Sequence, residues 1–493
     1  MKETSFARSA MRWLVRAGVA AAVGFALIVL LFAALARSKH PPLSSWHRLR
    51  LHEEFRAGLP SVKSFEDYLA LEGRLFAELH QKVLDEPAAA DPFVLSRYHA
   101  GSAPARRAWE TPYNRSFELK RESPRGAVLL VHGLSDSPYS MRAIADTFYE
   151  QGYDVVVLRL PGHGTIPSML RDVTWKDWYA AVEIAARYTA SRAGAGKPFL
   201  AGGHSTGAAL LTLYALRALD NPSLPRPSRL YLMSPAIGIS DFAFMTNVIS
   251  GLSFIPYFES SEWLDVLPEY DPYKYNSFPV NAARQIYHVT RELRSAFAAA
   301  AVSGHVAQMS RVTVFQSLID ATVSSVDVVR NLLALLPGEG NELVVFDVNR
   351  HETIQGLLAP APIEYLERIR NATGMPFRIT LIASRDASSD ELSSYSRAAR
   401  GADTVVTPLP LAWPKGVFSL SHVGVPFPPD DPVYGITPAA DALPAFPLGA
   451  VSARGESGAL VVPAALLARL RSNPFFDVIR STVVETCRAD EAR

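Results

Sequence analysis

Residues 198–207 read PFLAGGHSTG, a short apolar run that leads into a glycine-rich segment around Ser205. The stretch 208–219 that follows is rich in alanine and leucine and predicts a helix. The pattern Gly-x-Ser-x-Gly is weak evidence alone, but between a strand and a helix it is typical of a serine held in a sharp, strained turn. Gly203 and Gly207 would relieve the crowding there. We therefore predict that Ser205 is a nucleophile; the alternative is an ordinary strand-to-helix turn.

The serine lies within a regular alternation of apolar strands and helices. We predict strands at 126–131, 154–160, 198–202, 229–233, 312–318, 342–348 and 377–383, and helices at 140–151, 175–193, 208–219 and 474–487. Continuous apolar runs are typical of strands that are buried on both faces of a parallel sheet. The alternation therefore predicts an α/β protein with a mostly parallel, doubly wound sheet.

Two segments precede this alternation. Residues 65–84 carry leucine and phenylalanine at helical spacing, which predicts an amphipathic helix that packs against the main domain. Residues 86–112 show no period and are predicted to be linker and loop.

A serine hydroxyl needs a base to take its proton and a carboxylate to orient that base. In such a fold the acid follows a later strand, and Asp320 comes directly after the strand at 312–318. We predict Asp320 as the acid; its alternative role is to cap a helix that starts near Ser324. Beyond Asp320 the sequence has two histidines, His351 and His422. His422 stands among apolar residues ahead of a proline-rich loop, so we predict it as the base and keep His351, which has charged neighbours, as the alternative.

The negative charge that forms on the attacked oxygen needs donors that are in place beforehand, and backbone N–H groups near a helix start provide them. We predict Thr206, directly after the nucleophile, as one oxyanion-hole donor. The second is Leu134, which follows His132-Gly133 in the loop after the strand at 126–131. The alternative for this loop is a plain turn.

The N-terminus carries an uncharged run over residues 17–36, and about 20 apolar residues suffice to cross a bilayer as a helix. We predict a single-pass membrane anchor; a cleaved signal ending at 34–36 and a buried helix are the alternatives. Basic residues stand on both sides of the run, so charge alone does not orient it. Because an N-terminal apolar segment normally directs export, we expect a periplasmic or otherwise extracytoplasmic catalytic domain.

The overall composition excludes several other classes of protein. With 49 Lys and Arg against 48 Asp and Glu, no net field would attract nucleic acid, and no nucleic-acid partner is predicted. The single cysteine, Cys487, excludes an intramolecular disulfide and a cysteine-based zinc site. His132, His163 and His204 fall on separate loops rather than at ligand spacing, so no metal site is predicted and these side chains are expected to be polar groups around the site.

From these elements we expect five segments. They are an N-terminal stub and anchor (1–37), a juxtamembrane helical region with a linker (38–110), the first part of the catalytic core (111–238), a cap insertion (239–305), and the second part of the core with a C-terminal helix (306–493).

Several of these motifs resemble the α/β-hydrolase family, nearest its monoglyceride lipase and serine aminopeptidase-like branch. The matching residues are 131–134 (VHGL), 160–164 (LPGHG), 203–207 (GHSTG) and Asp320, and the resemblance spans about residues 126–422. It implies an α/β-hydrolase fold and a carboxylic ester hydrolase that needs no cofactor.

Further segments resemble a bacterial membrane-anchored subgroup of unassigned substrate, and this also favours His422. They are 346–350 (FDVNR), 419–422 (SLSH) and 426–435 (PFPPDDPVYG). The sequence departs from the family in the additional segment 352–416, because the family's histidine directly follows the last strand.

The interval between the strands at 229–233 and 312–318 is where this fold places a cap over the nucleophile. It is rich in aromatic residues, which either line an acyl pocket or simply pack the cap. They include Phe242, Phe244, Phe254, Tyr257, Phe258, Trp263 and Tyr273.

The predicted function is a serine hydrolase that cleaves small-molecule carboxylic esters with lipid-like or apolar acyl groups, through an acyl-enzyme on Ser205. One alternative is a serine peptidase or acyltransferase with the same three residues, since the acyl-enzyme is common to all of them. The other is a non-catalytic hydrolase-like domain that binds a ligand or partner at the membrane.

Overall fold

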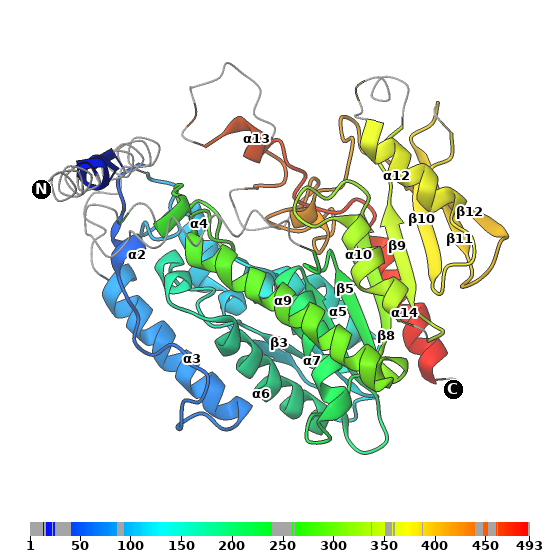
Figure 1. Cartoon of the computed structure of the whole chain (residues 1–493). Coiled ribbons are helices and arrows are strands. Elements are labelled where there is room, and N and C mark those ends of the chain that lie inside the picture. Colours follow the sequence, from blue (N-terminus) through cyan, green and yellow to red (C-terminus); the bar gives the residue numbers. More distant parts are fainter. Residues whose placement is uncertain are drawn as a thin grey trace, which may run out of the picture.

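The computed structural model of the chain describes residues 13, 16–21, 23–24, 41–85, 93–238, 259, 262–336, 338–350, 357, 360–386, 388–438, 447–451, 460 and 462–491. Within these residues, ten strands form one sheet (Figure 1). In spatial order they are β1 (Phe117–Leu119), β3 (Asp154–Leu158), β2 (Ala127–Val131), β4 (Phe199–His204), β5 (Arg229–Met233), β8 (Arg311–Ser317), β9 (Glu342–Phe346), β10 (Arg378–Ser384), β11 (Glu391–Arg397) and β12 (Thr404–Ala412). The seven strands from β3 to β10 pair in parallel, whereas β1, β11 and β12 are antiparallel to their neighbours. The predicted mostly parallel sheet is confirmed.

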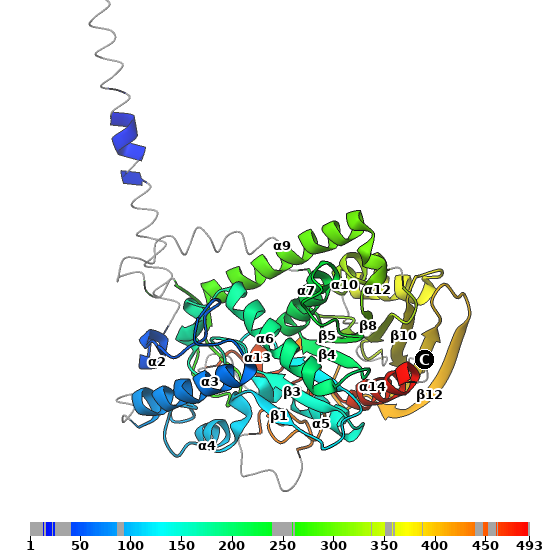
Figure 2. The same cartoon turned by 90° about the horizontal axis from the view of Figure 1, so that it is seen from below.

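Helices cover both faces of the sheet, as Figure 2 shows. On one face lie α6 (Trp175–Ala193), α7 (Thr206–Asp220) and α9 (Val280–Ser303), and on the other lie α5 (Arg142–Glu150) and α14 (Phe476–Glu491). The central strand β2 supplies both cores, because Leu129 and Val131 join the hydrophobic cluster under α6 and α7 while Val128 and Leu130 join the one under α5. The side chains of β2 thus alternate between the two faces, and both faces are buried.

The remaining helices and short strands lie around this core. They are α2 (Ser45–Arg48), α3 (Phe65–Leu79), the π-helix η1 (His80–Leu84), α4 (Ala103–Glu110), α10 (Ser325–Asn331), α12 (Pro360–Asn371), α13 (Ala464–Leu467), and the strand pair β6 (Trp263–Asp265) and β7 (Phe278–Pro279).

Helix α6 shows how local sequence sets an element's start. The Thr174 side chain accepts the N–H of Asp177, and the Asp177 carboxylate accepts the N–H of Thr174 in return. This capping box satisfies two of the N–H groups that a helix start leaves free. Asp177 also accepts the N–H of Ala57, so the same carboxylate ties the N-terminal segment to the core.

Two parts of the fold differ from the sequence prediction. The prediction of loop throughout 86–112 is wrong for α4, an eight-residue helix that is capped by Ser102 and buries Pro104, Ala105 and Ala108 on one side. The hairpin β11–β12 was not predicted either. Strand β11 is largely serine and charged residues, and β12, which is mostly exposed, contains Pro408 and Pro410, residues that are unusual inside a strand and tolerated at an edge.

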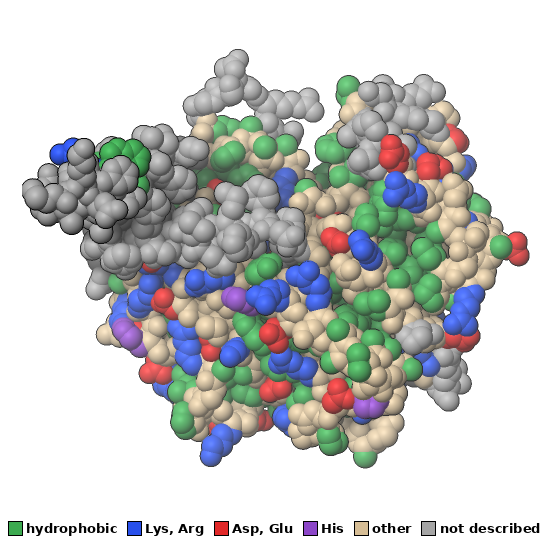
Figure 3. Space-filling model, in the orientation of Figure 1, with side chains coloured by type: hydrophobic (Ala, Val, Ile, Leu, Met, Phe, Trp, Pro, Cys, Tyr) green, Lys and Arg blue, Asp and Glu red, His purple; other side chains and the backbone are tan. Residues whose placement is uncertain are grey.

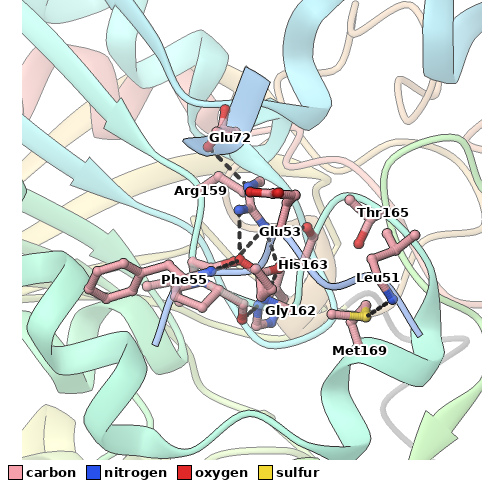
Figure 4. Close-up of polar contacts among 12 residues, drawn as sticks. Leu51, Glu53, Phe55, Glu72, Arg159, Gly162, His163, Thr165 and Met169 are labelled. Carbon is pink, nitrogen blue, oxygen red and sulfur yellow. Dashed lines mark hydrogen bonds and ion pairs between the residues drawn. The ribbon is translucent and has the colours of Figure 1, made fainter. Parts of the chain in front are cut away.

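A buried ion cluster attaches the N-terminal segment to the main domain. Arg159, directly after β3, binds both oxygens of Glu54 at 2.9 and 3.1 Å and one oxygen of Glu72 at 3.0 Å. All three side chains are buried. Arg159 also donates to the backbone oxygen of His163, so the cluster holds the 160–164 loop (Figure 4). Helix α3, which carries Glu72, packs against the main domain as the amphipathic pattern predicts.

Among the described residues, no helix is both long and apolar enough to cross a membrane. Most of the predicted anchor, from residue 25 onward, lies outside the described residues. The anchor therefore stays a prediction.

Candidate active site

Ser205 lies at the junction of β4 and α7 in a backbone conformation that residues other than glycine rarely adopt. Its φ is 50° and its ψ is −111°, and its exposed fraction is 8%. The flanking glycines are required by close approach: a Cβ on Gly203 would lie 2.7 Å from the backbone nitrogen of Ala208, and one on Gly207 would lie 2.2 Å from the backbone oxygen of Val131. The sharp turn that the motif predicts is therefore present, and it holds the serine at the carboxyl edge of the sheet.

Three serines share positive φ along this edge of the sheet. Ser135, Ser205 and Ser234 have φ angles of 62°, 50° and 43°, and they follow the neighbouring strands β2, β4 and β5. Such backbone strain persists where the surrounding structure enforces it, and it concentrates at functional sites. The edge that carries Ser205 is therefore strained at three adjacent points.

The loop after β2 lies directly beside the serine turn. Strands β2 and β4 are parallel with Val131 level with Gly203, so the residues that follow the two strands come side by side. A Cβ on Gly133 would lie 3.3 Å from Cβ of Ser205. Leu134 is the next residue of this loop, and Thr206 begins α7, where the first N–H groups of a helix have no partner within it.

Asp320 lies in the loop after β8 with four hydrogen bonds to its buried carboxylate. One oxygen accepts the N–H groups of Thr322 and Val323 at 2.8 and 2.9 Å. The other accepts Nε2 of Gln316 at 3.1 Å and Nδ1 of His422 at 2.8 Å. The alternative role of Asp320 as a helix cap is wrong, because the side chain of Ser324 caps α10.

The contact with Asp320 determines which nitrogen of His422 carries the hydrogen. A carboxylate can only accept, so Nδ1 donates and Nε2 is left with a lone pair. Burial raises the pKa of Asp320, but the bond from His422 and the N–H groups of the loop outweigh it, and the pKa lies below its ordinary value. Burial lowers the pKa of His422 below 6.5 despite the opposing effect of Asp320. At neutral pH the pair is a carboxylate beside a neutral imidazole, which is the form a general base requires.

His422 begins a single 3-10 turn, η9 (His422–Gly424), which is fastened to the end of the sheet. The hydroxyl of Ser317 donates to the backbone oxygen of Leu420 at 2.7 Å, and the N–H of Asn349 donates to that of Phe418 at 2.8 Å. Neither Ser317 nor Asn349 was predicted to have this role. Ser317 stands in no quoted motif, and Asn349 lies in the segment 346–350 (FDVNR), whose resemblance assigned it no function. His351, the alternative base, lies outside the described residues.

The proline-rich loop after His422 contacts the loop that carries Leu134. Asp431 is buried and accepts the hydroxyl of Tyr139 at 3.0 and 3.1 Å and the guanidinium of Arg142 at 3.3 Å. It also accepts the N–H groups of Val433 and Tyr434. This carboxylate therefore joins the proline-rich loop to the segment that follows Leu134.

The other three histidines of this edge have separate structural roles. Nε2 of His132 accepts the N–H of Leu160 at 3.0 Å, and burial lowers the pKa of His132 to about 4. Burial also holds the pKa of His163 well below 6.5. Nε2 of His204 donates to the backbone oxygen of His422 at 3.2 Å. Among the described residues, no group of three or more His, Cys, Asp or Glu side chains is placed to hold a metal ion.

Residues 239–258, 260 and 261 of the predicted cap lie outside the described residues, and with them five of its seven named aromatic residues. Phe242, Phe244, Phe254, Tyr257 and Phe258 all lie there. Trp263 and Tyr273 are described and buried: Trp263 packs edge-on against His47, and Tyr273 stacks on Tyr139. These two aromatic residues therefore serve packing.

The surface around α9 carries no dominant charge of either sign. Figure 3 shows Lys and Arg side chains interspersed with Asp and Glu over the face that α3 and α9 form. This mixture agrees with the net charge of +1 and indicates no electrostatic attraction for a highly charged ligand on this face.

Comparison with known families agrees with this geometry. A family model described as serine aminopeptidase, S33, matches residues 122–355, which run from just before β2 to just after β9. The matched region holds six of the seven parallel strands, all but β10, together with the strained serine turn and Asp320. The chain belongs to the α/β-hydrolase superfamily. His422 lies beyond the matched residues of this α/β-hydrolase, after strands β10 to β12.

This α/β-hydrolase is also similar to individual proteins. It is 46% identical over 56 residues to a thermostable monoacylglycerol lipase of Bacillus sp. (strain H-257), which is 11% of this chain and 22% of the lipase. The chain thus matches about a fifth of that lipase's length. Among solved structures, it is 21% identical to a chain from the metagenome-derived lipolytic enzymes LipS and LipT, covering 53% of this chain and 99% of the other with a TM-score of 0.36. It is 14% identical to a soluble variant of monoglyceride lipase from Saccharomyces cerevisiae, covering 47% and 81% with a TM-score of 0.36.

Proposed function

We propose that this α/β-hydrolase cleaves carboxylic esters through an acyl-enzyme on Ser205, with His422 as general base and Asp320 as the residue that orients it. The observation that carries the proposal is the 2.8 Å contact between Asp320 and Nδ1 of His422, because it leaves Nε2 of a neutral imidazole unprotonated beside the serine turn.

The proposed reaction uses each residue in turn. Nε2 of His422 takes the proton of the Ser205 hydroxyl as its oxygen attacks the ester carbonyl, and the N–H groups of Leu134 and Thr206 stabilise the negative charge on the carbonyl oxygen. The protonated His422 then gives this proton to the leaving alcohol, which forms the acyl-enzyme. A water molecule, deprotonated by His422, attacks the acyl carbon and releases the acid and the free serine.

The proposed substrate class rests on the sequence of the cap and of the N-terminus. The aromatic interval of the predicted cap and the apolar N-terminal run favour an ester with an apolar acyl chain presented near a lipid surface. The short stretch of identity with a monoacylglycerol lipase points the same way. We propose lipid-like esters as the substrates, with the chain anchored in a membrane through residues 17–36 and its catalytic domain outside the cytoplasm.

The direct test is labelling by a fluorophosphonate probe, which reacts with activated serines. We expect the intact protein to be labelled and Ser205→Ala to lose the label. Ser191→Ala, which removes an exposed serine of α6, is the matched control and should keep it. Absence of labelling in the intact protein would contradict the proposal.

The substrate class is tested with p-nitrophenyl esters of graded acyl length. We expect kcat/KM to rise from the acetate to medium and long acyl chains. A maximum at the acetate would identify a short-chain esterase instead.

The family description favours a second candidate, a serine aminopeptidase. The acyl-enzyme on Ser205 would be the same, with an amine as the leaving group. Assays with aminoacyl p-nitroanilides distinguish the two activities. If the protein hydrolyses the anilides and not the esters, it is a peptidase and the proposal of ester hydrolysis is wrong.

A further inference from the structure

Lys274 lies within the predicted cap, residues 239–305, and its side chain reaches the edge of the sheet that carries Ser205. Its Nζ donates to Oδ1 of Asp136 at 2.9 Å, and Asp136 lies in the loop after β2 with its side chain 8% exposed. The N–H of Lys274 donates to the buried carboxylate of Asp271, so the lysine backbone is itself fixed. The cation is thus held in place on a loop of the candidate active site.

The second oxygen of Asp136 faces the nucleophile turn. It lies 3.4 Å from Nδ1 of His204, a contact that is an ion pair only when this ring is protonated, and His204 immediately precedes Ser205. Nε2 of the same ring donates to the backbone oxygen of His422. Lys274, Asp136 and His204 therefore form a continuous line from the cap segment to both the nucleophile turn and the turn of the base.

Two neighbours of Lys274 contact the same loop. The N–H of Tyr275 donates to the backbone oxygen of Ser135 at 2.8 Å. The ring of Tyr273 stacks on that of Tyr139 with centroids 3.8 Å apart. Three successive residues of one segment therefore hold the loop that carries Leu134.

We propose that Lys274 is a positioning residue, which holds the oxyanion loop, residues 132–139, in place against the nucleophile turn through Asp136 and His204. The inference rests on the proposed function and adds to it a link between the placement of the cap and the assembly of the oxyanion hole. Oxyanion-hole donors stabilise the negative charge only when they are held in position beforehand. A loosened loop therefore lowers kcat more than it weakens substrate binding.

The charge of Lys274 gives this role a signature in the pH profile. The groups that act on His422 are Asp320, which raises its pKa, and His204 and Lys274, which lower it. Removing the lysine charge therefore raises the pKa of His422. Removing the charge of Asp136 leaves Lys274 uncompensated, so the pKa of His422 falls. A purely structural contact predicts no such opposite shifts.

The test measures hydrolysis of p-nitrophenyl butyrate by the variants Lys274→Met, Lys274→Arg and Asp136→Asn. For Lys274→Met we expect kcat to fall about 10- to 100-fold with KM within about threefold, and the acid limb of kcat/KM to move to higher pH. Asp136→Asn should lose activity too, with its acid limb moved to lower pH, and Lys274→Arg should recover most of the activity. Lys197→Met, whose exposed amine donates to the backbone oxygen of Pro124 ahead of β2, is the matched control.

A second measurement keeps the inference separate from the proposed function. Amide hydrogen exchange over residues 132–139 should be faster in Lys274→Met than in the intact protein or in Lys197→Met. If the intact protein resists the fluorophosphonate probe while this exchange still rises, the proposed function fails and the positioning role stands. If exchange and the pH limb of Lys274→Met equal those of Lys197→Met, the positioning role is overturned.

Discussion

Nδ1 of His422 lies 2.8 Å from Oδ2 of Asp320, although 102 residues separate them in the chain. The intervening residues include β9 and the antiparallel strands that follow β10, yet the turn of His422 returns to the end of the parallel sheet. The hydrogen bonds to Phe418 and Leu420 hold it there. The long segment between Asp320 and His422 is compatible with the site because both of its ends are held at the ends of the neighbouring strands β8 and β9.

Asp320→Asn should abolish most of the activity without unfolding the protein. An amide can donate to Nδ1, which stabilises the tautomer with hydrogen on Nε2, and that tautomer cannot accept the serine proton. We expect kcat to fall on the order of 10⁴-fold with a small change in KM. Steady-state kinetics measures this, and Asp386→Asn, an exposed carboxylate beyond β10, serves as the control. Loss of activity in both variants would argue against a specific role for Asp320.

The pH dependence of kcat/KM should follow the titration of His422. The base acts only when neutral, and burial lowers its pKa below 6.5. Activity should therefore fall as pH decreases through a midpoint below 6.5, and it should be constant above it until another group titrates. A stopped assay between pH 4 and 8 measures the midpoint. An acid limb centred above 6.5 would contradict the assignment.

Removal of Arg159 from its buried ion cluster should strongly destabilise the protein. Arg159→Met leaves the carboxylates of Glu54 and Glu72 buried without their partner, and breaking such a pair costs about 3–5 kcal/mol. Urea unfolding measures the loss. The control is Arg74→Met, which removes the exposed contact between Arg74 and Glu53 and should cost at most about 1 kcal/mol. Equal losses for the two variants would show that the cluster adds nothing beyond a surface pair.

Two glycine-to-alanine substitutions should have opposite effects. At Gly207 the new methyl group would lie 2.2 and 2.5 Å from the backbone oxygens of Val131 and His132, so α7 or the oxyanion loop must move. We expect Gly207→Ala to lose both activity and stability. At Gly73, in α3, nothing lies within 4 Å, and alanine should stabilise the helix by about 0.5–1 kcal/mol. Thermal unfolding and ester hydrolysis measure both; an active Gly207→Ala would show that this contact tolerates displacement.

The parallel strands and their helices could be predicted because their sequences carry the signal locally. Strand β5 occupies 229–233 as predicted, and β2, β3 and β4 begin or end within two residues of the prediction. Buried strands between glycine- and proline-containing turns have an apolar run that needs no knowledge of the partner. The hairpin β11–β12 lacks this signal because β11 is largely polar and β12 contains two prolines, so pairing with β10 and with each other holds these strands. Helix α4 is short and buries only Pro104, Ala105 and Ala108.

The features of the candidate site also divide into those that the local sequence predicts and those that only the tertiary structure reveals. The sequence by itself determined the strained turn of Ser205, because the glycines around it meet a steric requirement of a few adjacent residues. It also placed Asp320 after the strand that carries it. Only the tertiary structure decided that Asp320 meets His422, that Asp431 joins the proline-rich loop to Tyr139, and that Lys274 reaches Asp136. These contacts join residues more than 100 positions apart, and their distances depend on how the strands order in the sheet, which no local pattern encodes.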